Sequence, residues 1–134
     1  MEKEVKLSQA DVDQLPPAVW AYVGDAVYEL SMRLFTVSEG PRRMHQMHKE
    51  TARFVTATFQ ARASHVLEQH LTGQEQDILR RGRNSKSGHV PKSASPGEYR
   101  LSTGLEALIG YLYLTQQHRR LDELMLILRE AGEV

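Results

Sequence analysis

The chain has 134 residues, balances 17 basic against 17 acidic side chains, and contains no cysteine. This length suits one domain with its own core, and the 40% apolar content is typical of globular proteins. The lack of cysteine excludes disulfides, thiolate zinc sites and cysteine nucleophiles, so any metal ion must use oxygen or imidazole ligands. No stretch approaches the ~20 apolar residues of a membrane span, and the charged start does not resemble a signal peptide. We therefore expect a single domain over residues 1–134, located in the cytoplasm and without a membrane partner.

The charges are unevenly distributed along the chain. Residues 33–100 hold 12 basic and 6 acidic side chains, whereas the segments before and after them are acidic. Local clustering sets the field at a surface, so this distribution favours a basic face for nucleic acid. An ordinary solvated surface is the alternative.

Helical spacing in almost every segment predicts an all-α fold. The first strong helix begins after Pro16-Pro17 and runs to about Ser38, ahead of Gly40-Pro41. Its apolar residues recur at three- and four-residue steps and predict a buried stripe. That stripe comprises Val19, Val23, Ala26, Val27, Leu30 and Leu34. The opposite side is also largely apolar, so we expect both sides to be covered, with a second subunit as a candidate on one of them.

The helical pattern continues through residues 41–71, where we expect a break or kink, and a shorter helix is predicted over Gln74 to Arg81. Glycine, proline and serine residues from Gly82 to Gly97 predict the one substantial loop. Two further apolar stripes, over residues 105–112 and 121–128, predict the remaining helices, the last ending at Gly132.

Two acids stand in apolar helices. Asp25 lies in the middle of the most apolar helix, and Glu106 lies beside the apolar stripe of its own helix. A carboxylate partly removed from water needs a cation, hydrogen bonds or a raised pKa. For Asp25 alone, capping of a neighbouring helix or pairing with Arg33 or Arg100 is the alternative to a metal.

Each acid is near a glycine inside a helix, Gly24 and Gly110. Such glycines cost about 1 kcal/mol relative to alanine, a cost that is offset if two helices cross closely there. Close crossing would bring Asp25 and Glu106 together, and the pair would then share a proton or bind a divalent cation. With oxygen ligands only, Mg²⁺ fits best, with Mn²⁺ as the alternative, and two protein ligands suffice for phosphodiester hydrolysis.

Three segments carry a resemblance to a known family. The segment from Tyr22 to Leu30, YVGDAVYEL, resembles the signature helix of the ribonuclease III family, and Glu106 to Gly110 resembles its second acidic motif. Between them, RRGRNSKSG at residues 80–88 resembles the basic loop of the Mini-III branch, which consists of the nuclease domain alone. The resemblance covers roughly residues 11–132.

The resemblance implies a homodimer that cuts both strands of double-stranded RNA with magnesium, in maturation of the large-subunit (23S) ribosomal RNA precursor. It assigns the catalytic and metal-binding roles to Asp25 and Glu106. Larger members have two further acids, at positions that Ala18 and Thr103 occupy here. This leaves one ion per site, or a second ion recruited by RNA phosphates.

The chain ends at Val134, so we expect no separate duplex-binding domain, and the nuclease domain must bind RNA itself. Cationic and polar side chains over residues 80–92 are the expected RNA contacts. They are Arg80, Arg81, Arg83, Asn84, Lys86 and Lys92. A second basic group is less specific, because a solvated helix face explains it equally well. It comprises Arg42, Arg43, Lys49 and Arg53.

Other residues have weaker predicted roles. His45 and His48 are spaced to share a metal, but no third ligand stands near them in sequence. Trp20 and Tyr22 are candidates for the dimer interface, with ordinary core packing as the alternative. A ribosomal protein is a further candidate partner.

Two other functions are open: a non-catalytic RNA-binding or ribosome-assembly protein on the same fold, and a helical adaptor with no nucleic-acid role.

Overall fold

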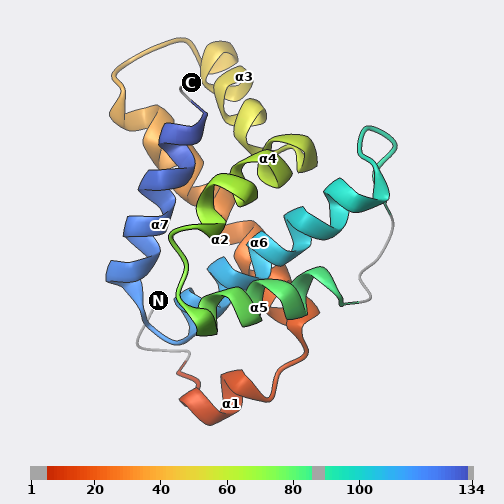
Figure 1. The fold of residues 1–134 in the computed structure, drawn as a ribbon. Coiled ribbons are helices and arrows are strands. Elements are labelled where there is room, and N and C mark those ends of the chain that lie inside the picture. Colours follow the sequence, from red (N-terminus) through yellow and green to blue (C-terminus); the bar gives the residue numbers. More distant parts are fainter. Residues whose placement is uncertain (1–5, 86–89, 133–134) are drawn as a thin grey trace.

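The computed structural model describes residues 6–85 and 90–132, and within these ranges it contains seven helices and no strand. The expected all-α fold is confirmed (Figure 1). The helices are α1 (Gln9–Asp13), α2 (Pro17–Ser38), α3 (Met44–Val55), α4 (Ala57–Glu68), α5 (Gly73–Arg83), α6 (Pro96–Leu114) and α7 (His118–Ala131).

The two longest helices, α2 and α6, cross at the centre of the molecule. Helices α4 and α5 pack on α6, while α1 and α3 lie at opposite ends of the structure (Figure 1). The largest buried side chains come mainly from these central helices, among them Trp20, Tyr28, Met32, Leu108 and Ile109. The core is therefore built around the α2–α6 crossing.

Glycines make this crossing possible. A Cβ atom at Gly24 would lie 2.8 Å from the backbone nitrogen of Gly110, and it would overlap the carbonyl group of Glu106. A Cβ atom at Gly110 would likewise overlap the carbonyl group of Trp20. The close helix crossing that we expected from these two glycines is confirmed.

The buried face of α2 differs from the prediction. Val19, Leu30 and Leu34, which belong to the predicted buried stripe, are exposed. The glycine face of α2 is covered by α6 instead, and it includes Tyr28 and Met32. Both faces of α2 carry apolar residues at helical spacing, so periodicity alone could not determine which one meets α6.

Some helix ends also differ from the expectation. The break within residues 41–71 falls at Thr56, whose side chain caps α4 by accepting from the Phe59 N–H at 3.1 Å. Pro96 and Gly97 were expected in the loop but form the first turn of α6. Ser95 caps that turn in a capping box with Glu98, and proline is favourable at the first helical position.

Helix α5 continues two residues beyond the prediction, to Arg83, so Gly82 is not the start of a loop. A Cβ atom at Gly82 would lie 3.0 Å from the Gly104 Cα atom. The short helix α1 was not predicted, although Ser8 and Asp11 form a capping box at its start.

Within residues 6–85 and 90–132, no helix combines the length and the apolar character that a bilayer crossing requires.

Candidate active site

The two predicted acids meet at the crossing of α2 and α6. Asp25 follows Gly24 on α2, and Gly24 packs directly against the backbone of Glu106 on α6. The two carboxyl groups are within hydrogen-bonding contact of each other. The predicted juxtaposition of Asp25 and Glu106 is confirmed.

The two acids differ in their exposure. Asp25 is exposed, so the expectation that its carboxylate is partly removed from water is wrong, whereas Glu106 is half-buried. Among the described residues no ion pair involves Asp25, and Arg33 instead pairs with Glu29 at 3.0 Å. The site thus has one acid facing solvent and one acid set into the protein.

Burial of Glu106, together with the charge of the adjacent Asp25, raises the pKa of the Glu106 carboxyl group to about 8. At neutral pH the metal-free pair therefore holds a proton between its two groups. A divalent cation would remove the repulsion that causes this, because it neutralises both carboxylates together. The donor set, two carboxylates without sulfur or imidazole, suits a hard ion such as Mg²⁺ or Mn²⁺.

Gln60 is a site residue that the sequence analysis missed. Its side chain on α4 is only 2% exposed, and its amide nitrogen lies 3.5 Å from a Glu106 carboxylate oxygen. The signal for it was a glutamine among the buried positions Phe59 and Ala61. Thr103, at the position of a further family acid, is buried and donates to the Tyr99 carbonyl at 3.0 Å, so its hydroxyl does not extend the pair.

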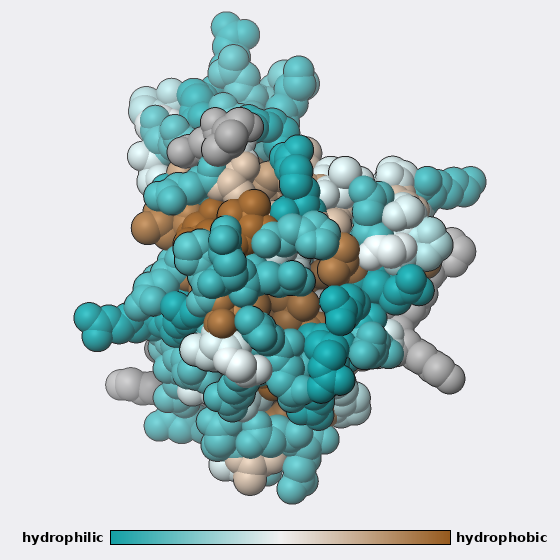
Figure 2. Space-filling view, in the orientation of Figure 1, coloured by the Kyte–Doolittle hydropathy of each residue, from teal (hydrophilic) through white to brown (hydrophobic). Residues whose placement is uncertain are grey.

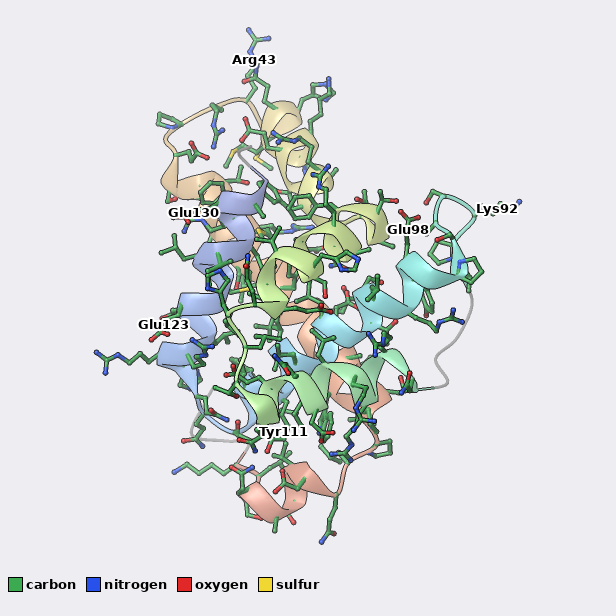
Figure 3. All side chains as sticks on the ribbon, viewed as in Figure 1. Arg43, Lys92, Glu98, Tyr111, Glu123 and Glu130 are labelled. Carbon is green, nitrogen blue, oxygen red and sulfur yellow. The ribbon has the colours of Figure 1, made fainter. Side chains whose placement is uncertain are left out.

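The predicted RNA-binding residues fall on two segments. Arg80, Arg81 and Arg83 occupy the last turns of α5, and Asn84 is its C-cap. Lys92 projects from the outer end of the turn before α6 (Figure 3), while Lys86 lies outside the described residues. Most of this basic group is therefore carried by a helix end, not by a loop.

Two of these arginines also make contacts within the protein. Arg80 forms an ion pair with Asp77 one turn earlier on α5. The Arg81 guanidinium lies over the Trp20 ring, 4.9 Å from its centre. Both arginines remain exposed, as does Asn84, whereas Arg83 is half-buried. These contacts fix the directions in which the side chains leave α5.

The second basic group is not a uniform surface. Arg42 is tied into the protein by Glu50 and by the Thr36 carbonyl group near the end of α2. Arg43 projects freely at one end of the molecule (Figure 3). His45 and His48 are exposed, and no group of three metal-capable His, Asp or Glu residues occurs in the described part of the chain.

The exposed side of α2 carries large apolar side chains. Tyr22 is 81% exposed, and it lines a groove with Asp25, Leu30 and Tyr113. Trp20 has no exposed surface: it packs edge-on against Tyr111 and donates to the Val12 carbonyl at 2.8 Å. Trp20 therefore takes the alternative role, as a core residue of the protomer, and it is not available to a second subunit.

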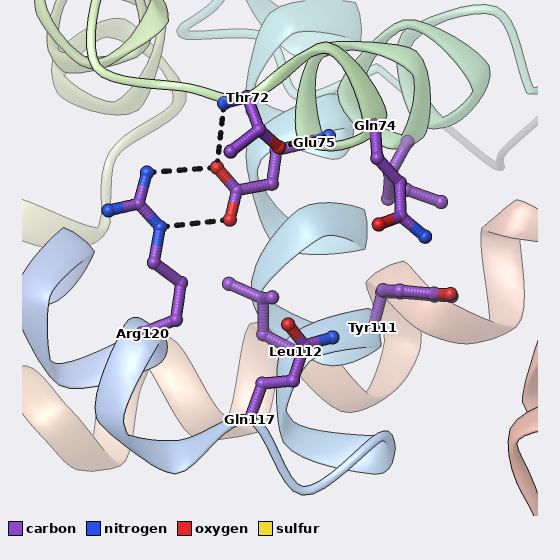
Figure 4. A pocket seen from close by; sticks show the side chains of 8 residues that line it. Thr72, Gln74, Glu75, Tyr111, Leu112, Gln117 and Arg120 are labelled. Atoms are coloured by element: carbon purple, nitrogen blue, oxygen red, sulfur yellow. Dashed lines mark hydrogen bonds and ion pairs between the residues drawn. The ribbon is translucent and has the colours of Figure 1, made fainter.

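Two of the hollows that lie apart from the acidic pair adjoin α7. One is closed on one side by Arg120 of α7, which binds both carboxylate oxygens of Glu75 at 2.9 Å and ties α7 to the start of α5 (Figure 4). The other is an apolar groove between α4 and α7, lined by residues including Val66 and Ile127 (Figure 2). Neither contains a predicted site residue.

Comparisons with known proteins agree with this geometry. A family model described as "Ribonuclease III domain" matches residues 18–117. The Mini-ribonuclease 3 of Symbiobacterium thermophilum is 50% identical over 111 residues, which cover 83% of this chain and 85% of that protein. The Mini-ribonuclease 3 of Clostridium tetani is 39% identical, with 90% and 80% covered.

A solved structure extends the likeness to the fold. The crystal structure of a Fusobacterium nucleatum protein superposes with a TM-score of 0.81 at 27% identity, covering 92% of this chain and 98% of that one. Together, the fold and the matches define an endoribonuclease that hydrolyses phosphodiester bonds. The chain belongs to the ribonuclease III family, and within it to the Mini-ribonuclease 3 branch. The family acts on double-stranded RNA, and membership suggests a divalent metal cofactor.

Proposed function

We propose that this protein cleaves double-stranded RNA in a magnesium-dependent reaction in which Asp25 and Glu106 are the catalytic, metal-binding acids. The observation that carries the proposal is the meeting of these two carboxyl groups where Gly24 and Gly110 let α2 and α6 touch. Few structural roles explain two acids placed against each other without an arginine between them.

The residues present fit a divalent ion. Glu106 offers a half-buried oxygen ligand, and exposed Asp25 leaves the outer side of the pair open to solvent and RNA phosphate. Mg²⁺ commonly binds through one or two carboxylates and keeps its remaining positions for water and phosphate, and Mn²⁺ can replace it. The ion would supply charge neutralisation and water activation at the scissile phosphate. Asp25 and Glu106 would hold it and fix its distance from the RNA backbone.

The basic end of α5 and the turn before α6 would hold the RNA. Arginine forks suit phosphate oxygens, and an A-form duplex is recognised mainly by its shape and backbone. We assign this role to Arg80, Arg81, Arg83, Asn84 and Lys92, together with Lys86 outside the described residues.

A homodimer would place two acidic pairs on one duplex, one for each strand. The exposed apolar side of α2 supports this, because Tyr22, Leu30 and Leu34 form the kind of surface that a second subunit covers. We therefore keep Tyr22 at the proposed interface and leave Trp20 in the core.

The biological substrate is proposed from the resemblance to the Mini-III branch. On that basis the substrate is the 23S ribosomal RNA precursor, cut in the cytoplasm by a single-domain enzyme, with a ribosomal protein as a candidate partner. A non-catalytic RNA-binding or ribosome-assembly protein on this fold is the alternative, and it predicts duplex binding without cleavage.

A cleavage assay separates these functions. A long RNA duplex is incubated with the wild-type protein and Mg²⁺, with EDTA as the metal-free arm, beside Asp25→Asn and Glu106→Gln. Asp122→Asn, which changes an exposed acid on α7, is the matched control. We expect wild type and Asp122→Asn to cut, and both site variants to bind the duplex without cutting it. Binding without cleavage by wild type under every divalent-ion condition would support the alternative.

A further inference from the structure

Gln60 joins the acidic pair from a third helix. It lies in the first half of α4, it is 2% exposed, and its amide nitrogen is 3.5 Å from a Glu106 carboxylate oxygen. A buried amide is costly unless its hydrogen-bonding groups have partners. The partners of Gln60 therefore indicate why a glutamine occupies this position.

The Gln60 side chain also lies beside the hydroxyl group of Tyr28, a fully buried residue on α2 one turn after Asp25. The Tyr28 hydroxyl donates its own proton to the carbonyl group of Phe54. Its oxygen is therefore left as an acceptor for the Gln60 amide. A hydroxyl oxygen that can only accept from Gln60 favours the orientation in which the amide NH₂ group faces Glu106.

The break between α3 and α4 creates this arrangement. Phe54 lies in the last turn of α3, where carbonyl groups lack partners within the helix, so its carbonyl is free to accept from Tyr28. Thr56 then starts α4 by capping it, and Gln60 follows one turn later with its N–H bonded to the Thr56 carbonyl at 3.0 Å. The backbone break, the tyrosine and the glutamine thus form one connected support behind Glu106.

We propose that Gln60 is a positioning residue, which holds the Glu106 carboxylate toward Asp25 in the arrangement that receives the divalent ion. A carboxylate has two oxygens with several lone pairs, so a donor on one of them fixes the group while leaving the rest for the ion. Hydrogen bonds of this kind to a ligand carboxylate commonly change metal affinity by about 10- to 100-fold. This inference rests on the proposed metal-binding function of the pair.

The test compares the purified full chain with Gln60→Met, which keeps a similar side-chain volume without the donors. Binding of Mn²⁺ alone is measured by titration calorimetry, and kcat and KM are measured on an RNA duplex. The matched control is Ser64→Ala, one turn later on α4, whose fully buried hydroxyl has no hydrogen-bond partner among the described residues. Tyr28→Phe is the second variant, because it keeps the ring and removes the hydroxyl that orients the amide.

We expect Gln60→Met to bind Mn²⁺ about tenfold more weakly and to lose kcat with an unchanged KM for RNA, while Ser64→Ala matches wild type. Tyr28→Phe should weaken Mn²⁺ binding in the same direction, and it decides the question if Gln60→Met does not fold. The inference would be overturned if folded Gln60→Met bound Mn²⁺ as tightly as wild type. If Gln60→Met does not fold, wild-type affinity in Tyr28→Phe would overturn it. If wild type itself neither binds Mn²⁺ nor cuts RNA, the proposed function fails and this inference fails with it.

Discussion

Gly24 and Gly110 occupy reciprocal positions in the two central helices: a Cβ atom added to either would lie 2.8 Å from the backbone nitrogen of the other. Real Cβ atoms do not approach other atoms so closely, so a side chain at either position would push α2 and α6 apart. Because Asp25 and Glu106 are carried by the same two helices, their separation depends on this backbone contact.

We therefore expect Gly24→Ala to lower the free energy of unfolding by about 3 kcal/mol and to abolish most of the RNA cleavage. Gly73→Ala is the control, since no described residue has an atom within 4 Å of a Cβ at that position, and it should be neutral or slightly stabilising. Urea unfolding and cleavage rates measure both effects. Equal stabilities of the two variants would contradict this account of the crossing.

The ionised carboxylate of Glu106 should destabilise the metal-free protein at high pH. Burial and the charge of Asp25 raise the folded-state pKa of Glu106 to about 8, above the ordinary value of 4.5, so the folded state holds this proton more tightly. Tighter binding of the proton stabilises the folded state fully below pH 4.5, and this stabilisation is lost as the pH rises through 8. In EDTA at pH 9, Glu106→Gln should be more stable than wild type by on the order of 1–3 kcal/mol.

Unfolding in urea at pH 5 and pH 9, with EDTA and with Mg²⁺, measures this effect. The advantage of Glu106→Gln should shrink at pH 5 and should also shrink when Mg²⁺ stabilises wild type. If Glu106→Gln were less stable than wild type at pH 9 in EDTA, other groups would have to stabilise the Glu106 carboxylate.

The ion pair between Glu75 and Arg120 should have the opposite pH dependence. Burial disfavours the Glu75 carboxylate, but hydrogen bonds from Arg120 and Thr72 outweigh this and lower the Glu75 pKa below its ordinary value of 4.5. A lowered folded-state pKa stabilises the protein above pH 4.5, and the contribution is lost as the pH falls through the folded-state value.

At pH 7, we expect Glu75→Gln to cost about 2 kcal/mol, because it removes the buried carboxylate that binds Arg120 and leaves the guanidinium with only the exposed Glu123 as an ion-pair partner. Asp77→Asn breaks the exposed pair with Arg80 and should cost less than about 0.5 kcal/mol. Thermal unfolding of both variants at pH 7 and pH 3 gives the comparison. A Glu75→Gln penalty as large at pH 3 as at pH 7 would count against ionisation as its origin.

RNA binding should depend on salt through the basic end of α5. We expect Arg83→Ala to weaken duplex binding severalfold and to reduce the slope of log K against log salt by roughly 1, as loss of one phosphate contact does. Arg119→Ala, an exposed arginine on α7, is the matched control and should leave both values unchanged. Fluorescence anisotropy with a labelled duplex from 50 to 200 mM salt measures the slope, and an unchanged slope for Arg83→Ala would remove it from the interface.

Local sequence signals determined much of the fold. The limits of α2 follow from Pro17 at its start and Gly40-Pro41 after its end, because proline and glycine have strong preferences at helix boundaries. The meeting of Asp25 and Glu106 could be predicted because helix-interior glycines are costly unless two backbones touch. The helix-boundary signals depend only on neighbouring residues, and the glycine signal depends only on backbone contact between two helices.

Other features depend on long-range packing, which the sequence does not display. Both sides of α2 are apolar, so only its pairing with α6 decides that Tyr28 is buried and Leu30 exposed. Pro96 and Gly97 favour a loop in isolation, but the capping box of Ser95 makes them the first turn of α6. Gln60 is a site residue only because the break at Thr56 turns α4 toward Glu106.

The most direct test of the central claim is the position of the ion itself. Crystals of the protein soaked in Mn²⁺ and measured for anomalous scattering should show a peak between the carboxylates of Asp25 and Glu106, and none in crystals of Glu106→Gln. A peak that persists in Glu106→Gln, or that lies only at His45 and His48, would contradict the assignment of these two acids as the metal-binding pair.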